Sequence, residues 1–326
     1  PPNLNGIKIL TLGCVRSVMW GNLDVSNLDV LTPYIESALE RNLLYYNLNP
    51  FEFLAFKTKG NLFKIENNTL HFGWHGVIGA RFLKLYFPPI HLYGDEEIER
   101  ESVLKATNEG CSLWIEKEHS KALGVKAKTI SEYRGAYQPI YHRDYQLAGK
   151  KYKNMRRDRN ILHSLIESGE LEFVFDYPLK GLTGLNNAWL SQTGRKRSVF
   201  DFCLQNEKHL THRIKNLTLL NRDGEPITSS LYAIYSPDKW HCIGAISDYG
   251  KIPIGGLQRQ SDLYLFELEE KVNLVMVGGY SYKELKFSKL ALPHSVYRLG
   301  TLPSNITVTK DIWESFRPKP QTYFGV

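Results

Sequence analysis

The chain has 326 residues, of which 42% are hydrophobic and 12% are aromatic, and it carries 41 Lys and Arg against 34 Asp and Glu. This composition supplies enough apolar side chains for a substantial core, suits about two domains of ordinary size, and excludes a disordered chain. The formal net charge of +7 predicts anionic partners, which include nucleic acid, an acidic membrane surface and a phosphorylated carrier.

The cysteines show no spacing that indicates disulfide pairs or a metal site. They are Cys14, Cys111, Cys203 and Cys242, and none of them forms a Cys-x-x-Cys pair. This pattern favours a reducing compartment. No apolar run reaches the roughly 18 residues of a membrane span, and the first residues have no signal-peptide pattern. We therefore expect a cytoplasmic protein.

The first half of the chain predicts mixed strands with one crossover helix. A strand comes first, and a helical segment ends near Asn47. The aromatic alternation of residues 51–72, which is broken at Gly60 and at Asn67 and Asn68, predicts hairpin structure. The other predicted elements are a strand at 83–87, a helix at 94–110 that begins with acids and ends at Gly110, and a strand at 112–115.

The second half predicts a compact α+β order, in which helices cover a mixed sheet. The predicted strands are 171–177, 217–220, 227–235, 240–247 and 272–277, and the predicted helices are 198–215, 256–271 and 280–290. The pair Asp223 and Gly224 favours a hairpin turn. The two halves share the order of their elements rather than their letters, so an internal duplication is a hypothesis about topology only.

The segment 144–168 places six cations within ten positions and then takes on the pattern of an amphipathic helix. The cations are Lys150, Lys151, Lys153, Arg156, Arg157 and Arg159. The helix stripe that we expect to be buried consists of Leu162, Leu165 and Ile166. One end of this segment is therefore expected to bind an anion and the other end to pack.

The spacing of these cations places them in pairs on a helix. Lys153 and Arg157 share a face, as do Arg156 and Asn160, so each pair sets two donors beside one phosphate or carboxylate. A solvated basic helix start explains the same charge equally well. Neighbouring aromatic side chains either stack on a base or line the edge of the core, and they are Tyr141, His142, Tyr145 and Tyr152.

A second informative segment runs from the strand at 272–277 through Gly278 and Gly279 into the predicted helix. Such a corner leaves backbone N–H groups free to receive an anion or an oxyanion, although an ordinary turn has the same glycines. Lysines follow along the helix at Lys283, Lys286 and Lys289. The residues expected at the reacting end are Gly279, Tyr280, Lys283 and Lys286.

Other chemistry has little support in the sequence. Cys203, His209 and His212 come nearest to a metal ligand set, but their spacing brings them only loosely onto one face. Walker A, dinucleotide and nucleophile-elbow motifs do not occur. Acid/base candidates that the spacing does not pair are Asp144, Asp201, Asp248, His142 and His241. The general base is therefore left unassigned.

At residues 144–162 the sequence resembles the family of the phosphatidylglycerol lysyltransferase C-terminal domain, a DUF2156-like tandem of two acetyltransferase-like (GNAT) folds related to the Fem-type aminoacyltransferases. The matching positions are Tyr145, Leu147, Gly149, Lys150, Lys151, Tyr152, Arg157 or Arg159, and Asn160. A second match comprises Asn273, Gly278, Gly279, Leu285, Lys286, Lys289, Pro293 and Tyr297. With a weaker match at 88–115, the resemblance spans roughly residues 20–300.

The resemblance implies an α+β protein of two tandem GNAT-like domains, at 1–140 and 141–326, with the basic helix at their junction. It also implies acyl or aminoacyl transfer to an amine or hydroxyl, without a metal, from aminoacyl-tRNA or acyl-CoA. The GNAT pyrophosphate loop is not clearly present, which weighs against acyl-CoA. The residues expected to hold phosphates are Tyr145, Lys150, Lys151, Lys153, Arg156, Arg157 and Asn160.

Three further possibilities stay open at the level of sequence. The acceptor is expected to be a nucleic acid or another polar molecule, and DNA hypermodification at a base is one form of this reaction. A lipid aminoacyltransferase is an alternative, since the named family acts on lipid. The third is a non-catalytic GNAT-like module that only binds nucleic acid, with an affinity that falls steeply with salt.

Overall fold

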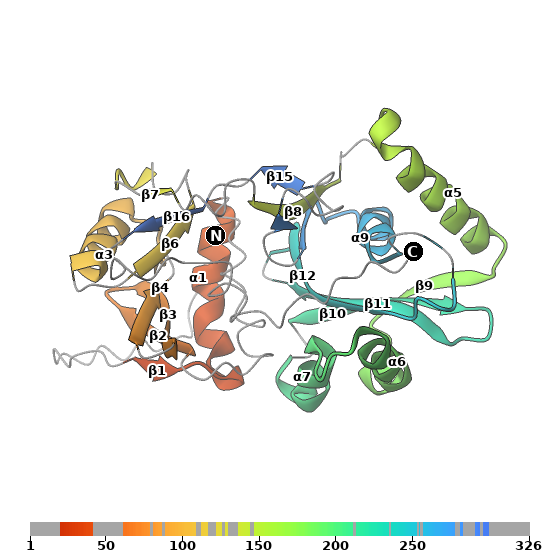
Figure 1. Ribbon diagram of the computed structural model, residues 1–326, viewed down its shortest axis with the longest axis horizontal. Coiled ribbons are helices and arrows are strands. Elements are labelled where there is room, and N and C mark those ends of the chain that lie inside the picture. The colour runs from red at the N-terminus through yellow and green to blue at the C-terminus, as the bar shows by residue number, and fades with distance from the viewer. Residues whose placement is uncertain are drawn as a thin grey trace, which may run out of the picture.

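The computed structural model describes residues 20–41, 61–78, 81–86, 89–108, 112–116, 122–125, 128–129, 136–143, 147–210, 213–234, 236–252, 254, 257–277, 281–282, 291–293 and 296–299. Over these ranges the chain forms two eight-stranded mixed sheets that lie side by side, with helices packed on their faces (Figure 1). The predicted α+β class is confirmed.

The first sheet is built on an antiparallel meander that is followed by a parallel strand. The meander consists of β2 (Asn61–Glu66), β3 (Thr69–Ile78) and β4 (Arg81–Tyr86). The crossover helix α3 (Glu96–Asn108) then leads to β6 (Ser112–Glu116), which is parallel to β4. Asn67 and Asn68, between β2 and β3, both have positive φ, as the predicted hairpin turn requires.

The second sheet repeats this order. Its antiparallel strands are β9 (Leu171–Phe175), β10 (Ile214–Asn221), β11 (Pro226–Ile234) and β12 (Lys239–Ser247). The crossover helix α9 (Leu257–Leu268) leads to β13 (Leu274–Val277), which is parallel to β12. The repetition of a meander, a crossover helix and a parallel strand supports the predicted duplication of topology.

Each sheet also takes a strand from the opposite half of the chain. β8 (Ala136–His142) pairs antiparallel with β13 of the second sheet, and β16 (Val296–Leu299) pairs with β6 of the first. The smaller strands are β1 (Gly21–Asn22), β5 (Ile90–His91), β7 (Lys128–Thr129), β14 (Ser281–Tyr282) and β15 (Ala291–Pro293). β8 lies across the expected domain boundary at residue 140, which stays a prediction.

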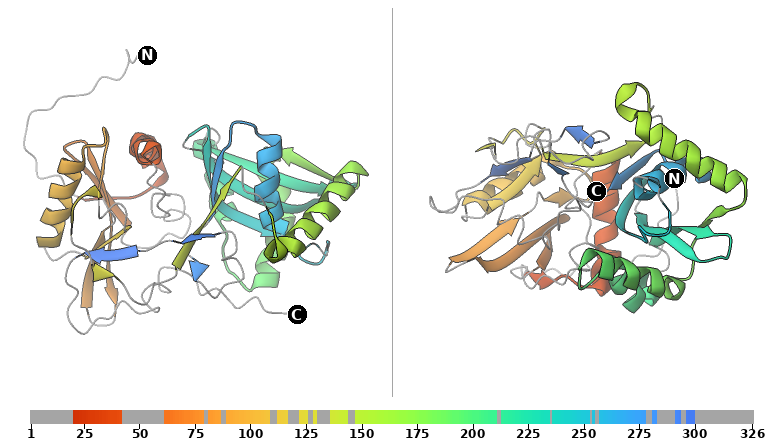
Figure 2. Two further views of the ribbon diagram at one scale, coloured as in Figure 1. Left: turned by 90° about the horizontal axis from the view of Figure 1, so that it is seen from above. Right: turned by 45° about the vertical axis from the view of Figure 1, so that its right-hand side comes forward.

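Helices cover both faces of the second sheet (Figure 2). α5 (Lys153–Glu167) and α9 lie on one face, and α6 (Thr183–Thr193) and α7 (Val199–Gln205) lie on the other. α1 (Leu28–Glu40) lies between the two sheets, while α3 covers the outer side of the first. The short helices are η1 (Val25–Asn27), η4 (Lys150–Tyr152), η5 (Leu179–Leu182) and α8 (Glu207–Leu210).

The largest hydrophobic cluster of the described residues joins the two halves through α1. Leu31 and Ile35 of α1 pack in one cluster with Leu70 of β3 and with Leu185 and Phe200 from α6 and α7. Polar contacts reinforce this junction, since Lys239 Nζ donates to the Leu39 carbonyl oxygen at 2.7 Å and Arg213 donates to Asp29 and Thr32.

The predicted helix at 198–215 is wrong in its second part. Ser198 and Asp201 form a capping box that starts α7, but the backbone leaves the helical region at Asn206. After α8, the chain enters β10 at Ile214, so this strand begins earlier than predicted. Helix α6 was not predicted, because its sequence mixes Gly184 and several polar residues with few apolar ones.

Two other predicted helices are only partly described. The helix expected over 280–290 is wrong at its start, because residues 281–282 form β14, while residues 283–290 lie outside the described ranges. The helix expected to end near Asn47 ends at Glu40. The strand predicted before it falls outside the described residues.

Candidate functional site

Helix α5 confirms the predicted amphipathic pattern. Leu162 is fully buried, and Leu165 and Ile166 are partly buried in the same cluster beneath the helix. Tyr152, in the turn that precedes α5, is also buried against the second sheet. Tyr152 is therefore a core side chain and not a ring that stacks on a base. The basic start of the helix is thus anchored on the sheet from below.

The arginines of α5 have partners within the protein. Arg156 donates to the carbonyl oxygens of Leu147 and of Gly149, the latter at 2.9 Å, and so holds the segment before the helix. Arg159 pairs with Glu267 of α9. These two guanidinium groups consequently fix the position of α5, and their donors are partly used.

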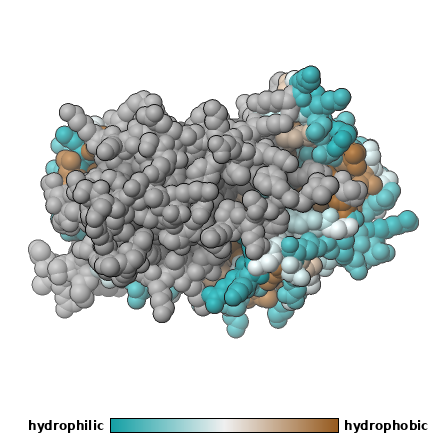
Figure 3. All heavy atoms as spheres, in the orientation of Figure 1, coloured by the Kyte–Doolittle hydropathy of each residue, from teal (hydrophilic) through white to brown (hydrophobic). Residues whose placement is uncertain are grey.

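The exposed side of α5 carries the remaining cations. Lys150 and Lys153 are exposed and contact no acid of the described chain, and the Arg157 side chain is 66% exposed while it also bonds Asp158 at 2.8 Å. Asn160 lies on the exposed side as well. We call Lys150, Lys153 and Arg157 the α5 cation row, and Figure 3 shows hydrophilic side chains over this outer side of the helix.

Several predicted site residues are not described by the structure. Tyr145 and the four residues expected at the reacting end, Gly279, Tyr280, Lys283 and Lys286, all lie outside the described ranges. Lys151 belongs to η4, but its side chain is not described. The roles predicted for these residues therefore stay predictions.

Within the described residues, β12 extends past its parallel partner. Pairing between β12 and β13 is described up to Cys242 and Val277, and β12 continues to Ser247 beside β11. Ligands of open sheets bind in the crevice outside the carboxyl ends of the strands. The carboxyl end of β12, at residues 243–247, therefore lies on the side of the sheet where such ligands bind.

A buried polar cluster lies between β11, β12 and α9. The Tyr232 hydroxyl donates to Asp262 Oδ1 at 2.6 Å, and both residues are fully buried. Burial raises the pKa of Tyr232, and the nearby Asp262 charge raises it further. Sequence reasoning missed this cluster, although a carboxylate within the apolar stripe of α9, beside Leu263 and Leu265, was an available signal.

The buried cysteines and His241 are poorly suited to acid/base or nucleophilic work at neutral pH. Burial raises the pKa of the Cys242 thiol, with a further contribution from Asp262, and raises that of Cys203 to about 12. Both thiols therefore stay protonated and unreactive. Burial also lowers the pKa of His241 to about 4, so its imidazole is neutral.

Two of the carboxylates considered for acid/base chemistry have structural partners. Asp201 caps α7 through Ser198 and accepts a bond from Asn186 at 2.8 Å. Asp248 accepts from Gln192 Nε2 at 2.9 Å and from the Gly250 N–H at 3.1 Å. Both arrangements hold chain segments together, and neither points to proton transfer.

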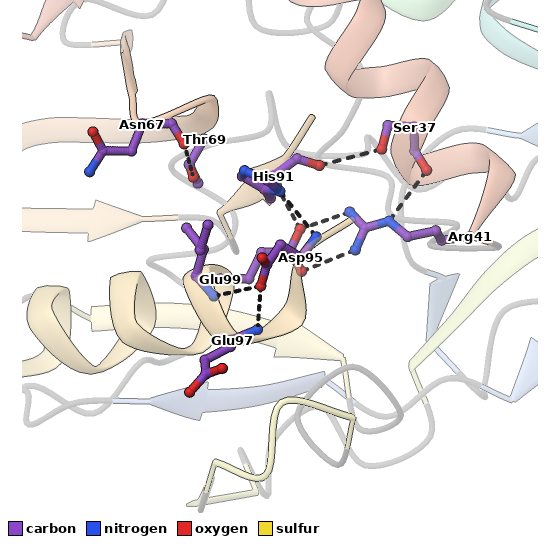
Figure 4. A network of polar contacts seen from close by, with 9 residues as sticks. Ser37, Arg41, Asn67, Thr69, His91, Asp95, Glu97 and Glu99 are labelled. Atoms are coloured by element: carbon purple, nitrogen blue, oxygen red, sulfur yellow. Dashed lines mark hydrogen bonds and ion pairs between the residues drawn. The ribbon is translucent and has the colours of Figure 1, made fainter. Parts of the chain in front are cut away.

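The first half contains a polar network that is centred on a buried carboxylate (Figure 4). Arg41, at the end of α1, binds the fully buried Glu99 carboxylate through two bonds of 2.7 and 3.1 Å. The His91 N–H donates to the same carboxylate at 2.6 Å, and His91 Nδ1 accepts from the Asp95 N–H. These bonds tie α1 to α3 and β5, so the network is structural.

The described ranges contain no group of three His, Cys, Asp or Glu side chains that is arranged to hold a metal ion. Likewise, none of the helices in these ranges combines the length and the apolar character needed to cross a bilayer.

Comparison by sequence finds no matching family model and no matching curated protein. Solved structures do match. A conserved protein of unknown function from Bacteroides thetaiotaomicron VPI-5482 has a TM-score of 0.61 at 14% identity, over 86% of this chain and 98% of that chain. L-PGS from Bacillus licheniformis has a TM-score of 0.55 at 15% identity, over 83% and 91%.

FemX matches with a TM-score of 0.51 at 9% identity, over 87% of this chain and 97% of that chain. At such identities the likeness concerns the fold. The resemblance inferred from the two sequence motifs is confirmed at that level: this chain has the tandem GNAT-like fold of L-PGS and FemX.

Proposed function

We propose that the protein is an acyl- or aminoacyltransferase that moves its group from an activated anionic carrier to an amine or hydroxyl. The single observation that carries the proposal is the α5 cation row, Lys150, Lys153 and Arg157, exposed on a tandem GNAT-like fold. The fold supports the reaction class, and the cations support a phosphorylated carrier.

The reaction needs only a held carbonyl group and an approaching nucleophile. The acceptor nitrogen or oxygen attacks the carbonyl carbon of the carrier's ester or thioester, and a tetrahedral oxyanion forms. The bond to the carrier then breaks, and the carrier oxygen or sulfur leaves with the electron pair. The proton that the acceptor loses passes to this leaving group or to water. In this proposal the N–H groups around Gly279, with Tyr280, Lys283 and Lys286, stabilise the oxyanion.

Aminoacyl-tRNA is the carrier that we favour over acyl-CoA. The cation row runs from Lys150 in η4 to Arg157 near the start of α5, so its charges follow one another along the basic end of the helix. A spread of this kind suits successive phosphates of a polymer, which hold the carrier in position without reading its sequence. A CoA pyrophosphate needs only a compact site.

Intact mass spectrometry of candidate acceptors tests the reaction directly. Duplex DNA, tRNA and anionic lipid vesicles are incubated with the protein and either charged tRNA or acyl-CoA. A mass gain on one acceptor identifies donor, group and acceptor together. If no acceptor gains mass while salt-sensitive binding to nucleic acid persists, the transferase proposal fails and a binding module remains.

The double variant Lys153→Ala with Arg157→Ala tests the role of α5. Losing two phosphate contacts is expected to lower kcat/KM for the carrier by on the order of 10-fold or more. A matched control removes two cations from α3, as Arg100→Ala with Lys105→Ala. Equal losses in both double variants would mean that the net charge alone matters, which would contradict a specific role for α5.

A further inference from the structure

A second basic surface lies on the face of the sheet opposite α5. The loop between α6 and α7 contains Arg195, Lys196 and Arg197 in succession and no acid. In Figure 1, α5 lies on one side of strands β9–β12 and α6 and α7 lie on the other. Figure 3 shows hydrophilic side chains gathered over this region too.

The loop is held at both ends by helix caps. Gly194 adopts φ 62° and ends α6, and the Arg195 N–H donates to the Leu190 carbonyl oxygen at 3.1 Å. At the other end, Ser198 and Asp201 close the capping box of α7. The three cations are therefore presented from a backbone that is fixed on either side, which lowers the entropy cost of binding.

The three cations of this loop differ in their contacts with the rest of the protein. The Arg195 guanidinium lies over the ring of Trp189 in α6, 5.1 Å from the ring centroid. Lys196 and Arg197 are exposed and bond no acid of the described chain. The nearby carboxylates, Asp201 and Asp248, are occupied by the caps and by Gln192. The local charge is thus available to a ligand.

An exposed aromatic ring lies beside the loop. Tyr249 is 59% exposed, and its N–H donates to Gln192 Oε1 at 3.3 Å, in the last turn of α6. It lies two residues after Ser247, the last residue of β12. Cations combined with an exposed ring are the chemistry that binds single-stranded nucleic acid, through phosphates and through stacking on a base.

We propose that Lys196, Arg197 and Tyr249 form a docking surface for single-stranded nucleic acid. Two exposed cations together with an exposed ring favour nucleic acid over a small anion, because they suit both phosphates and a base. This surface and the α5 cation row lie on opposite faces of the sheet (Figure 1), and a polymer is long enough to contact both. The inference deepens the proposed function, on which it rests, by making the carrier a nucleic acid with an unpaired end. Stacking of one base on Tyr249 then places the neighbouring phosphates against the loop.

Fluorescence anisotropy with a labelled single-stranded RNA of mixed sequence tests the surface without any transfer step. The affinity is measured across a series of salt concentrations. For Lys196→Ala with Arg197→Ala, the slope of log K against log salt is expected to fall by about 1.4, since each contact with a single strand contributes about 0.7. The α3 double variant Arg100→Ala with Lys105→Ala is the charge-matched control, with an unchanged slope.

Two substitutions at Tyr249 separate stacking from hydrogen bonding. Tyr249→Phe keeps the ring and is expected to bind as the parent does, whereas Tyr249→Ala is expected to bind about 10-fold more weakly. Circular dichroism and Tm confirm that each variant is folded. The result expected with a duplex of the same sequence is weaker binding than with the single strand.

An unchanged salt slope in the loop variant, equal losses in the two Tyr249 variants, or preference for the duplex would each overturn the inference. A failure of the proposed transferase function would give a different set of results. If RNA binds through the loop but no acceptor gains mass, only the transferase proposal fails. If transfer occurs while loop variants bind RNA normally, only the docking surface fails.

Discussion

Glu99 lies at the centre of the first half as a carboxylate with no exposed surface. Its charge is balanced by Arg41 from α1, which is itself only partly exposed. A buried pair of this type contributes little compared with apolar residues of the same size, but removing one partner leaves a charge without compensation. The pair therefore adds a charge-dependent contact to the apolar and polar contacts that already position α1.

Arg41→Met is expected to lower the free energy of unfolding by about 3–5 kcal/mol, because Glu99 is then buried without its cation. The double variant Arg41→Met with Glu99→Gln is expected to be less destabilised, since the charge is gone and Gln still accepts from the His91 N–H. Urea denaturation measures both. Lys105→Met, which removes an exposed cation 3.7 Å from Glu66, is the control, with an expected change of about 0–1 kcal/mol. A double variant less stable than Arg41→Met would contradict this account.

At the scale of elements, α5 shows how a periodic pattern translates into structure. The sequence places Leu162 on the apolar stripe and Ile161 beside it, and the structure buries the first completely and leaves the second 42% exposed. Two neighbouring aliphatic residues of one helix thus have opposite environments. The difference depends only on the helical period, which is visible in the sequence.

Leu162→Ala is expected to destabilise the protein by about 2–5 kcal/mol, because the vacated space beneath α5 is enclosed by Ile227 and Leu257. Ile161→Ala, on the same helix and of the same size change, is expected to cost less than about 1 kcal/mol. Thermal unfolding of the two variants gives the comparison. Similar losses in both would mean that α5 packs in another register.

Local sequence patterns predicted most of the helices and strands correctly. They did not predict contacts between residues that are distant in sequence. Asn67, Asn68 and Gly224 indicate hairpin turns because these residue types readily adopt the positive φ that such turns need. The bond between Tyr232 and Asp262 joins residues thirty positions apart, and no spacing rule reveals it. A different reason applies to Arg156. The sequence suggests it as a ligand, but the structure ties it to carbonyl oxygens of Leu147 and Gly149 in the segment just before the helix, and no residue pattern indicates a bond to backbone.

At the scale of the whole molecule, the exchange of β8 and β16 makes each sheet depend on both halves. Tyr297 and Arg298 lie between β6 and β7 and pair with both. The first sheet is therefore completed by residues that follow the second sheet in sequence. This strand exchange and the cluster around α1 indicate that the two halves unfold as one cooperative unit. A destabilising substitution in one half is therefore expected to destabilise the other.

Arg298→Pro is expected to reduce amide-exchange protection in β6 and β7, because proline removes a backbone donor from a strand that is paired on both sides. Hydrogen exchange followed by mass spectrometry localises the effect. Protection in β10 and β11, which pair with each other far from the substitution, serves as the internal reference. Undiminished protection in β6 would show that β16 is dispensable.

β16 is translated long after β6, and this delay affects how the first sheet forms during synthesis on the ribosome. When β6 leaves the exit tunnel, the strand that will cover its edge has not yet been translated. At ordinary elongation rates this interval lasts about 10–40 s. During that time the nascent first sheet presents an unpaired edge to other polypeptides. Completion of the first sheet thus waits until β16 has been translated, and protection from premature association during synthesis becomes a requirement of this topology.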